Sequence, residues 1–191
     1  MGRVINSTFV SLDGVLNHMD KWHFDFVDDE TNDLAMRQLR ASRSLLMGRN
    51  TYDVYASSWP TRDGELADRI NSMRKYVAST TLTSADWTNT TVIGSDLVDR
   101  VAELREQPGD ILMHGYGPVA RTLLANGLLD ELFLWVHPHL AGVGSTDDML
   151  WEEGVNQRLR LLDSRTLKSG LITLSYEPTN VASPRSDRNS P

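Results

Sequence analysis

The alternation of short apolar runs with helical patterns most constrains how this 191-residue chain can fold. Six β-prone runs end near Gly, Ser, Asp or Pro and are expected to be strands: residues 3–10, 44–48, 75–80, 90–94, 110–115 and 131–137. Helical patterns lie between several of them, around Leu34 and Leu39, over 97–104 behind Asp96, and over 118–127. The last pattern is the clearest, with Pro118 suited to a first helical turn and Gly127 to a left-handed C-terminal position.

Strands that alternate with helices predict a mainly parallel sheet covered on both faces. The C-terminal part differs, because residues 158–167 and 171–176 flank the turn-prone stretch 168–170 and predict an antiparallel hairpin at the sheet edge. We therefore expect a three-layer α/β/α fold with a mixed sheet, in a single domain over residues 1–177. From Pro178 onward the composition is polar, so residues 178–191 are expected to form a disordered tail.

Composition excludes several classes of function. The net charge of −7 is spread over mixed residues, without the basic stripe that a nucleic-acid partner requires. No cysteine is present, so thiolate zinc sites, disulfides and a cysteine nucleophile are excluded, and a cytoplasmic location is expected. No apolar run approaches the roughly 20 residues of a membrane span. His137 and His139 lack a nearby third ligand, so no metal site is expected.

Two segments at the C-terminal ends of strands carry chemistry that suits a phosphate. In the first, Gly48 lets the backbone approach a ligand, Arg49 can pair with a phosphate and Thr51 can donate a hydroxyl. The second places Ser79 and Thr80 at the C-terminal end of a strand, the edge where open α/β sheets bind ligands. Each of these turns could also be an ordinary turn, since Ser and Thr are common there for local reasons.

A third turn, residues 114–121, again joins a strand to a helix start through glycine. Its helix N-terminus would suit a pyrophosphate if Gly115 and Gly117 let the backbone approach the ligand. The segment is neither the Rossmann fingerprint nor a P-loop, so neither of those nucleotide-binding classes is indicated.

Four segments occur in an order that resembles a known family: Ser11-Leu12-Asp13-Gly14-Val15, Met47-Gly48-Arg49-Asn50-Thr51-Tyr52, Lys75 to Thr80, and Gly115 to Leu132 with its GLLDEL stretch. The chain is similar, over about residues 3–177, to the dihydrofolate reductase-like family that includes the reductase domain of the riboflavin-biosynthesis deaminase-reductase. Dihydrofolate reductases proper carry paired glycines at the third turn, whereas this chain has Gly115-Tyr116-Gly117. That difference favours the riboflavin-reductase-like branch of the family and makes folate a less suitable substrate.

The resemblance implies NADPH as hydride donor. By that resemblance, Gly48, Arg49 and Thr51 would hold the cofactor phosphates, with Arg49 at the 2′-phosphate, and Ser79 and Thr80 would line the adenosine end. The pyrophosphate would be held by Gly115, Tyr116, Gly117, Pro118 and Val119. The loop with Asp13 and Gly14 would close near the nicotinamide.

Reduction of a C=N or C=O group also needs a proton donor, usually a carboxyl group or a water that it positions. Acidic residues cluster at positions 28–33, where dihydrofolate reductases place their acid, and Asp29 and Asp33 are the candidates. The helix dipole alone also favours acidic residues at a helix start, and such residues are mostly solvated there without a catalytic role. Trp22, Tyr55 and Trp59 are candidates for an aromatic wall over a planar heterocycle.

Residues 131–137 alternate in a way that would let one set of side chains face the core and the other a partner subunit. Together with the exposed edge expected near residues 158–177, this predicts a homodimer.

Two hypotheses about function remain. The first is an NADPH-dependent reductase of a small heterocyclic or ribosylated substrate, resembling 5-amino-6-(5-phosphoribosylamino)uracil reductase and dihydrofolate reductase. Without cysteine the chain has no zinc deaminase segment, so it is expected to act as a stand-alone reductase domain. The second is a non-catalytic nucleotide-binding or sensing module of the same fold.

Overall fold

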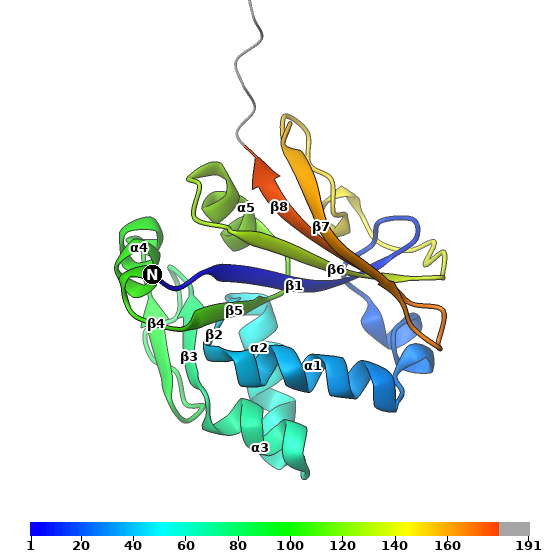
Figure 1. Cartoon of the computed structure of the whole chain (residues 1–191). Helices are drawn as coiled ribbons and strands as arrows, with labels where there is room; N and C mark the ends of the chain where they lie inside the picture. Colours follow the sequence, from blue (N-terminus) through cyan, green and yellow to red (C-terminus); the bar gives the residue numbers. More distant parts are fainter. Residues whose placement is uncertain (180–191) are drawn as a thin grey trace, which may run out of the picture.

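The computed structural model describes residues 1–179, which form an eight-stranded sheet in the order β4-β3-β2-β5-β1-β6-β8-β7 (Figure 1). The strands are β1 (Val4–Ser11), β2 (Ser42–Gly48), β3 (Arg74–Ala78), β4 (Thr90–Ile93), β5 (Asp110–His114), β6 (Glu131–His137), β7 (Arg158–Thr166) and β8 (Ile172–Thr179). From β4 to β6 in this order the strands are parallel, and β8 and β7 add antiparallel pairs. The mixed, mainly parallel sheet is as expected.

The hairpin between β7 and β8 closes over the expected turn. Leu167 N donates to the carbonyl of Leu171 at 2.8 Å, and Gly170 has a φ of +87°, which glycine adopts without strain. Strand β8 continues to Thr179, two residues beyond the expected domain boundary. The tail expected for the remaining residues, 180–191, lies outside the described part of the chain.

Helices cover both faces of the sheet. They are α1 (Asp29–Ala41), α2 (Arg49–Ser58), α3 (Glu65–Ser72), α4 (Leu97–Glu106) and α5 (Pro118–Ala125), with short 3-10 turns η1 (Met19–Lys21), η2 (Phe24–Phe26), η3 (Trp59–Thr61) and η4 (Thr146–Asp148). Leu39, Tyr52 and Ile70 place α1, α2 and α3 on one face, whereas Val101 and Leu123 place α4 and α5 on the other. Within residues 1–179 no helix has the length and apolar character needed to cross a membrane.

Strand β6 contacts a core on each of its faces. Leu132 and Leu134 belong to a cluster with Val10 of β1, and Trp135, with Phe133 packed nearby, belongs to a cluster with Leu34 of α1. This chain's own residues therefore pack against both faces of residues 131–137, and the contact with a partner subunit expected there stays a prediction.

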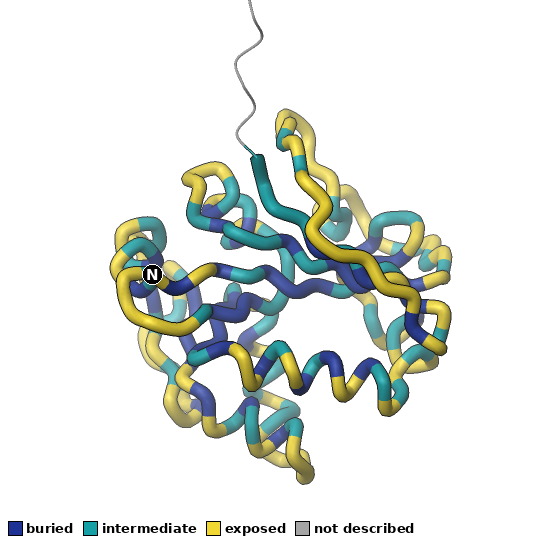
Figure 2. Tube along the Cα trace, in the orientation of Figure 1, coloured by how far each residue is buried: buried dark blue, intermediate teal, exposed yellow. Residues whose placement is uncertain are grey.

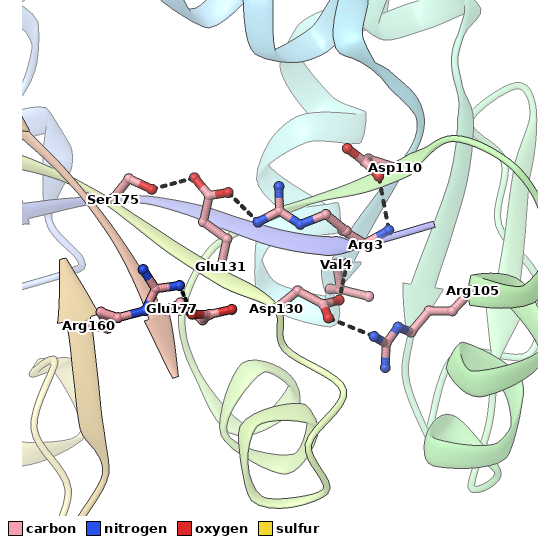
Figure 3. Close-up of polar contacts among 9 residues, drawn as sticks. All are labelled: Arg3, Val4, Arg105, Asp110, Asp130, Glu131, Arg160, Ser175 and Glu177. Carbon is pink, nitrogen blue, oxygen red and sulfur yellow. Dashed lines mark hydrogen bonds and ion pairs between the residues drawn. The ribbon is translucent and has the colours of Figure 1, made fainter. Parts of the chain in front are cut away.

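The two carboxylates of the GLLDEL stretch have structural partners at the N-terminal ends of the strands (Figure 3). Asp130 accepts hydrogen bonds from the backbone N–H of Val4 at 2.7 Å and from Arg105 of α4 at 2.6 Å. Glu131 accepts from Arg3 at 2.7 Å and from the hydroxyl of Ser175 in β8 at 2.6 Å. This end of the sheet is opposite the edge where the strand-to-helix turns lie, so these carboxylates hold strands and α4 together.

Candidate functional site

The first and third glycine turns meet at one edge of the sheet. Strands β2 and β5 pair with each other in parallel, and they end at this edge, at Gly48 and His114. A Cβ atom on Gly115 would lie 2.4 Å from the Oγ1 of Thr51, and one on Gly48 would lie 3.4 Å from Val119. The sequence predicted that the turns share an edge, and the structure brings them into direct contact.

Two helix N-termini open at this contact without side-chain caps. Gly48 precedes α2 and Gly117 precedes α5, and neither can cap the free N–H groups of its helix with a side chain. Uncapped N–H groups and the positive end of the helix dipole favour an anion. Gly115 has a φ of +82°, whereas Gly117 is extended, at −169°, with no atom within 4 Å of a Cβ placed on it. The open space over Gly117 thus lies next to donors that suit a phosphate.

Arg49 stands at the start of α2, where its guanidinium is already paired. Its Nε lies 2.8 Å from both carboxylate oxygens of Asp53, four residues further along the helix. The side chain is 40% exposed, and no hydrogen bond within residues 1–179 uses its two terminal nitrogens. Those nitrogens are therefore the part of Arg49 that could reach a phosphate.

The second turn is partly occupied by its own backbone. The hydroxyl of Ser79 accepts from the N–H of Leu82 at 3.0 Å, and the Ser79 N–H donates to the carbonyl of Ile93, while Thr80 is exposed. Beside it lies a turn that the sequence analysis passed over, residues 94–96, because Ile93 of β4 pairs with Ala78 of β3. Its order of strand, glycine and helix is the same as in the first and third turns and could have revealed it.

Asp13 links two loops at the far end of this edge. Its carboxylate accepts from the hydroxyl of Ser11 at 2.6 Å and from the backbone N–H groups of Ala141 and Gly142 at 2.9 Å each. The hydrogen bond from Ser11 and those from the two backbone groups lower the pKa of Asp13 to about 2. Gly14 has a φ of +89°, and its carbonyl accepts from the N–H of Leu150. The loop is therefore fixed to residues 139–150, and its closure near a nicotinamide stays a prediction.

The two candidate acids lie on the outer side of α1. Thr31 and Leu34 are buried toward the sheet, and Gln38 bonds to it, so at about 100° per residue Asp29 and Asp33 fall roughly opposite. Both acids are exposed, and Asp33 lines a surface groove shared with α3. Asp28, beside them, caps α1 through a reciprocal pair of hydrogen bonds with Thr31. A proton-donor role for Asp29 or Asp33 remains a prediction without support from their positions.

A polar cluster that the sequence analysis missed faces α1 and α2 instead. Trp135 Nε1 donates to the hydroxyl of Ser7 at 2.9 Å, and that hydroxyl donates to Gln38 at 2.9 Å. On the neighbouring strand, His114 is the register partner of Ser7, and its Nδ1 lies 3.0 Å from the hydroxyl oxygen of Tyr55 in α2. His114 is the first residue of the third turn, and that position in the sequence could have drawn attention to its side chain.

Tyr55 and His114 are both uncharged near neutral pH. Burial raises the pKa of Tyr55 to about 12, with the charge of Arg62 acting weakly in the other direction. Burial lowers the pKa of His114 to about 4. Of the expected aromatic wall, Tyr55 and Trp59 do pack together, with ring centroids 5.8 Å apart, whereas Trp22 is buried against His137.

Known proteins agree with this architecture. The uncharacterized protein YyaP of Bacillus subtilis (strain 168) is 28% identical over 139 residues, which are 70% of this chain and 72% of YyaP. A solved structure named as a riboflavin biosynthesis protein, from Shewanella sp. PV-4, superposes with a TM-score of 0.68 at 22% identity, covering 94% of this chain and 99% of the other. A pyrimidine reductase-like protein from Corynebacterium diphtheriae gives a TM-score of 0.62 at 15% identity, covering 93% and 92%.

A family model matches most of the chain. It spans residues 3–173, from the first strand into the last, and includes every turn described above. The chain therefore belongs to the RibD C-terminal domain family.

Proposed function

We propose that this protein is an NADPH-dependent reductase that transfers hydride to a C=O or C=N group of a small heterocyclic or ribosylated substrate. The observation that carries the proposal is the contact between two uncapped helix starts, α2 and α5, at the ends of adjacent strands. Two such N-termini side by side suit a pyrophosphate better than a single phosphate, because each supplies its own free N–H groups.

The residues at this edge fit the cofactor in type and order. The first turns of α2 and α5 would hold the pyrophosphate, and the free nitrogens of Arg49 would pair with the 2′-phosphate of NADPH. Thr51 reaches Gly115 across the contact and so fixes the relative position of the two turns. When bound, the dihydronicotinamide supplies a hydride, and the chain's own side chains bind and orient the acceptor.

Substrate chemistry is inferred from relatives and from the polar cluster. The names of the similar structures refer to riboflavin biosynthesis and to a pyrimidine reductase-like protein, which supports a heterocyclic acceptor. Ser7, Gln38, Tyr55 and His114 offer uncharged hydrogen-bonding groups next to the third turn, which suits the polar edge of a neutral heterocycle.

The test combines cofactor binding with turnover. Calorimetric titration with NADPH and NADH should give saturable binding with NADPH preferred, and the absorbance of NADPH should fall steadily with at least one compound from a panel of pteridines and ribosylated pyrimidines. Binding of NADPH without turnover across the panel would favour the non-catalytic module. Absence of binding to either nucleotide would overturn the proposal.

A further inference from the structure

We propose that Tyr55, positioned by His114, donates the proton that completes the reduction, in place of a carboxyl group on α1. The inference rests on the proposed reductase function. It names a proton donor for that reaction, a role that the acidic residues of α1 are not placed to fill.

The position of the pair at the candidate site is the first argument. His114 is the last residue of β5 and is followed at once by Gly115, whose turn touches that of α2. Tyr55 comes from α2 itself, two turns after the helix start that is proposed to hold the pyrophosphate. A group bound across these turns would therefore lie beside both side chains, whereas Asp29 and Asp33 are on the far side of α1.

The hydrogen bonding around the pair is the second argument. Within residues 1–179 the only side-chain partner of the Tyr55 hydroxyl is His114 Nδ1, and no hydrogen bond uses His114 Nε2. The neighbouring groups Ser7 and Gln38 are uncharged and already joined to each other and to Trp135. When the neutral imidazole of His114 carries its proton on Nδ1, it donates to the Tyr55 oxygen and leaves the phenolic proton free for the substrate.

A nearby cation supports the same role. The guanidinium of Arg62 lies 4.7 Å from the ring centroid of Trp59, and Trp59 packs against Tyr55. The charge of Arg62 lowers the pKa of Tyr55, against the larger effect of burial. Arg62 would therefore stabilise the phenolate that remains after the proton has left.

The step balances as follows. Hydride and its electron pair form the new C–H bond on the substrate, and the π electrons of the C=O or C=N group move onto oxygen or nitrogen. That atom takes the proton of Tyr55 as the phenolic O–H bond breaks. The phenolate accepts a hydrogen bond from Nδ1–H of His114 and recovers a proton from water after the product leaves, while NADPH ends as NADP⁺. A phenol with a pKa of about 12 is a stronger acid than an alcohol, whose pKa is close to the 15.7 of water, so the transfer to an alkoxide is favourable.

The experiment compares two tyrosines of the same helix. Tyr55→Phe removes the proposed donor, and Tyr52→Phe removes a buried hydroxyl one turn earlier, whose partner is the N–H of Trp87. NADPH dissociation constants are measured by calorimetry, and kcat and KM with the panel compound that the wild-type protein turns over fastest. Tyr55→Phe should lower kcat by about 100-fold or more, as expected for loss of a general acid, with NADPH affinity nearly unchanged. Tyr52→Phe should keep the wild-type kcat.

Further variants test the positioning residues. His114→Asn retains a donor near the Nδ1 position and should keep more of kcat than His114→Leu, and Arg62→Lys should keep more than Arg62→Ala.

The outcomes separate the two proposals. A folded Tyr55→Phe protein with wild-type kcat would overturn the proton-donor assignment and leave the reductase function intact, as would a loss of kcat confined to Asp29→Asn or Asp33→Asn. A wild-type protein that binds NADPH but reduces nothing in the panel would overturn the reductase function, and the proton donor with it.

Discussion

Gly115 and Thr51 approach each other so closely that the third turn tolerates no side chain at this position: a Cβ on Gly115 would lie 2.4 Å from the Oγ1 of Thr51. The positive φ of Gly115, +82°, adds a second reason, because L-residues pay a steric penalty there. The two turns are therefore assembled as a unit, and changes at Gly115 and Gly117 should have different consequences.

Gly115→Ala should lower the free energy of unfolding by about 1–3 kcal/mol and abolish the rise in melting temperature that NADPH gives the wild-type protein. Gly117→Ala should leave the melting temperature of the free protein nearly unchanged, since Gly117 is extended and open. A methyl group there would still point into the space assigned to the pyrophosphate. Thermal denaturation with and without saturating NADPH measures both effects, and a full NADPH shift in folded Gly117→Ala would remove this turn from the cofactor site.

Arg49 should decide the preference between the two nicotinamide cofactors. Arg49→Ala is expected to weaken NADPH binding by about 1.5–3 kcal/mol, as for a charge-assisted hydrogen bond, and to leave NADH binding almost unchanged. Calorimetry with both cofactors measures the difference, and equal losses would contradict the assignment to the 2′-phosphate.

Asp53 offers a second test of the same assignment. It pairs with Arg49 through Nε, so Asp53→Asn keeps one acceptor for that nitrogen and removes a negative charge near the proposed phosphate. Without this charge, NADPH should bind more tightly by about 0.5 kcal/mol, a size typical of interactions between exposed charges. NADH affinity should not change, and an equal gain for NADH would place the effect elsewhere than at the 2′-phosphate.

The sequence predicted the sheet and its turns because these depend on local patterns. Over residues 118–127, for instance, α5 begins at Pro118, and Gly127 takes a φ of +66° after it, as expected. The eight-residue α3 was missed, since it is too short for a clear apolar period between Gly64 and Met73.

The chemistry at the site was harder to predict because it depends on direction and on distant pairs. Four acidic side chains between positions 28 and 33 gave no indication of which face of α1 meets the sheet, and Asp29 and Asp33 are on the outer face. Tyr55 and His114 are 59 residues apart in the chain, and only the packing of α2 over β2, the neighbour of β5 in the sheet, brings them together. Hydrogen bonds of that range leave no local pattern in a single sequence.

Stability should fall on mild acidification because of buried histidines. His23 Nδ1 lies 2.9 Å from His137 Nε2, and His137 Nδ1 lies 2.9 Å from the carbonyl of Trp135. Burial, and secondarily His137, lowers the pKa of His23 to about 4, and burial lowers that of His137. Because these groups bind protons more readily in the unfolded state, unfolding free energy should decrease as pH falls from 6.5 toward 4.

Each such imidazole contributes at most about 1.4 kcal/mol per pH unit, and less at the partly exposed His23. Denaturant titrations at several pH values measure the slope, which should be smaller in His23→Phe than in the wild type. The pKa of Asp13 is lowered to about 2 by hydrogen bonds, so this carboxylate adds to the loss of stability only toward the acidic end of the window, where the unfolded chain begins to protonate it. A slope that is the same in His23→Phe and the wild type would assign the effect to other groups.

Asp130 should be worth more to stability than a typical surface carboxylate. Asp130→Ala leaves the N–H of Val4 and the half-buried Arg105 without their acceptor, so the free energy of unfolding should fall by about 2–3 kcal/mol. Asp163→Ala removes an exposed carboxylate paired with Arg165 and should change it by less than about 0.5 kcal/mol. Chemical denaturation of the two variants gives the comparison, and similar losses in both would show that the network at Asp130 is not specific.

The edge strand β7 remains the reason to expect a homodimer. It pairs only with β8 in the described sheet, and most of its residues are exposed (Figure 2), including Leu161 and Leu162, whose exposed fractions are 51% and 41%. An edge with free ladder groups and exposed leucines pairs readily with a second copy. Light scattering at micromolar concentration should therefore give twice the monomer mass of 21.5 kDa.

Charged variants locate the dimer contact. Leu161→Lys places a charge on the edge and should shift the protein toward the monomer mass, because lysine on an edge strand opposes pairing. Leu140→Lys changes a leucine that is 68% exposed in the loop after β6, and it should leave the dimer intact. A wild-type protein with the monomer mass would refute the dimer. A dimer that Leu161→Lys does not weaken, but Leu140→Lys does, would move the contact from β7 to the loop over residues 139–150.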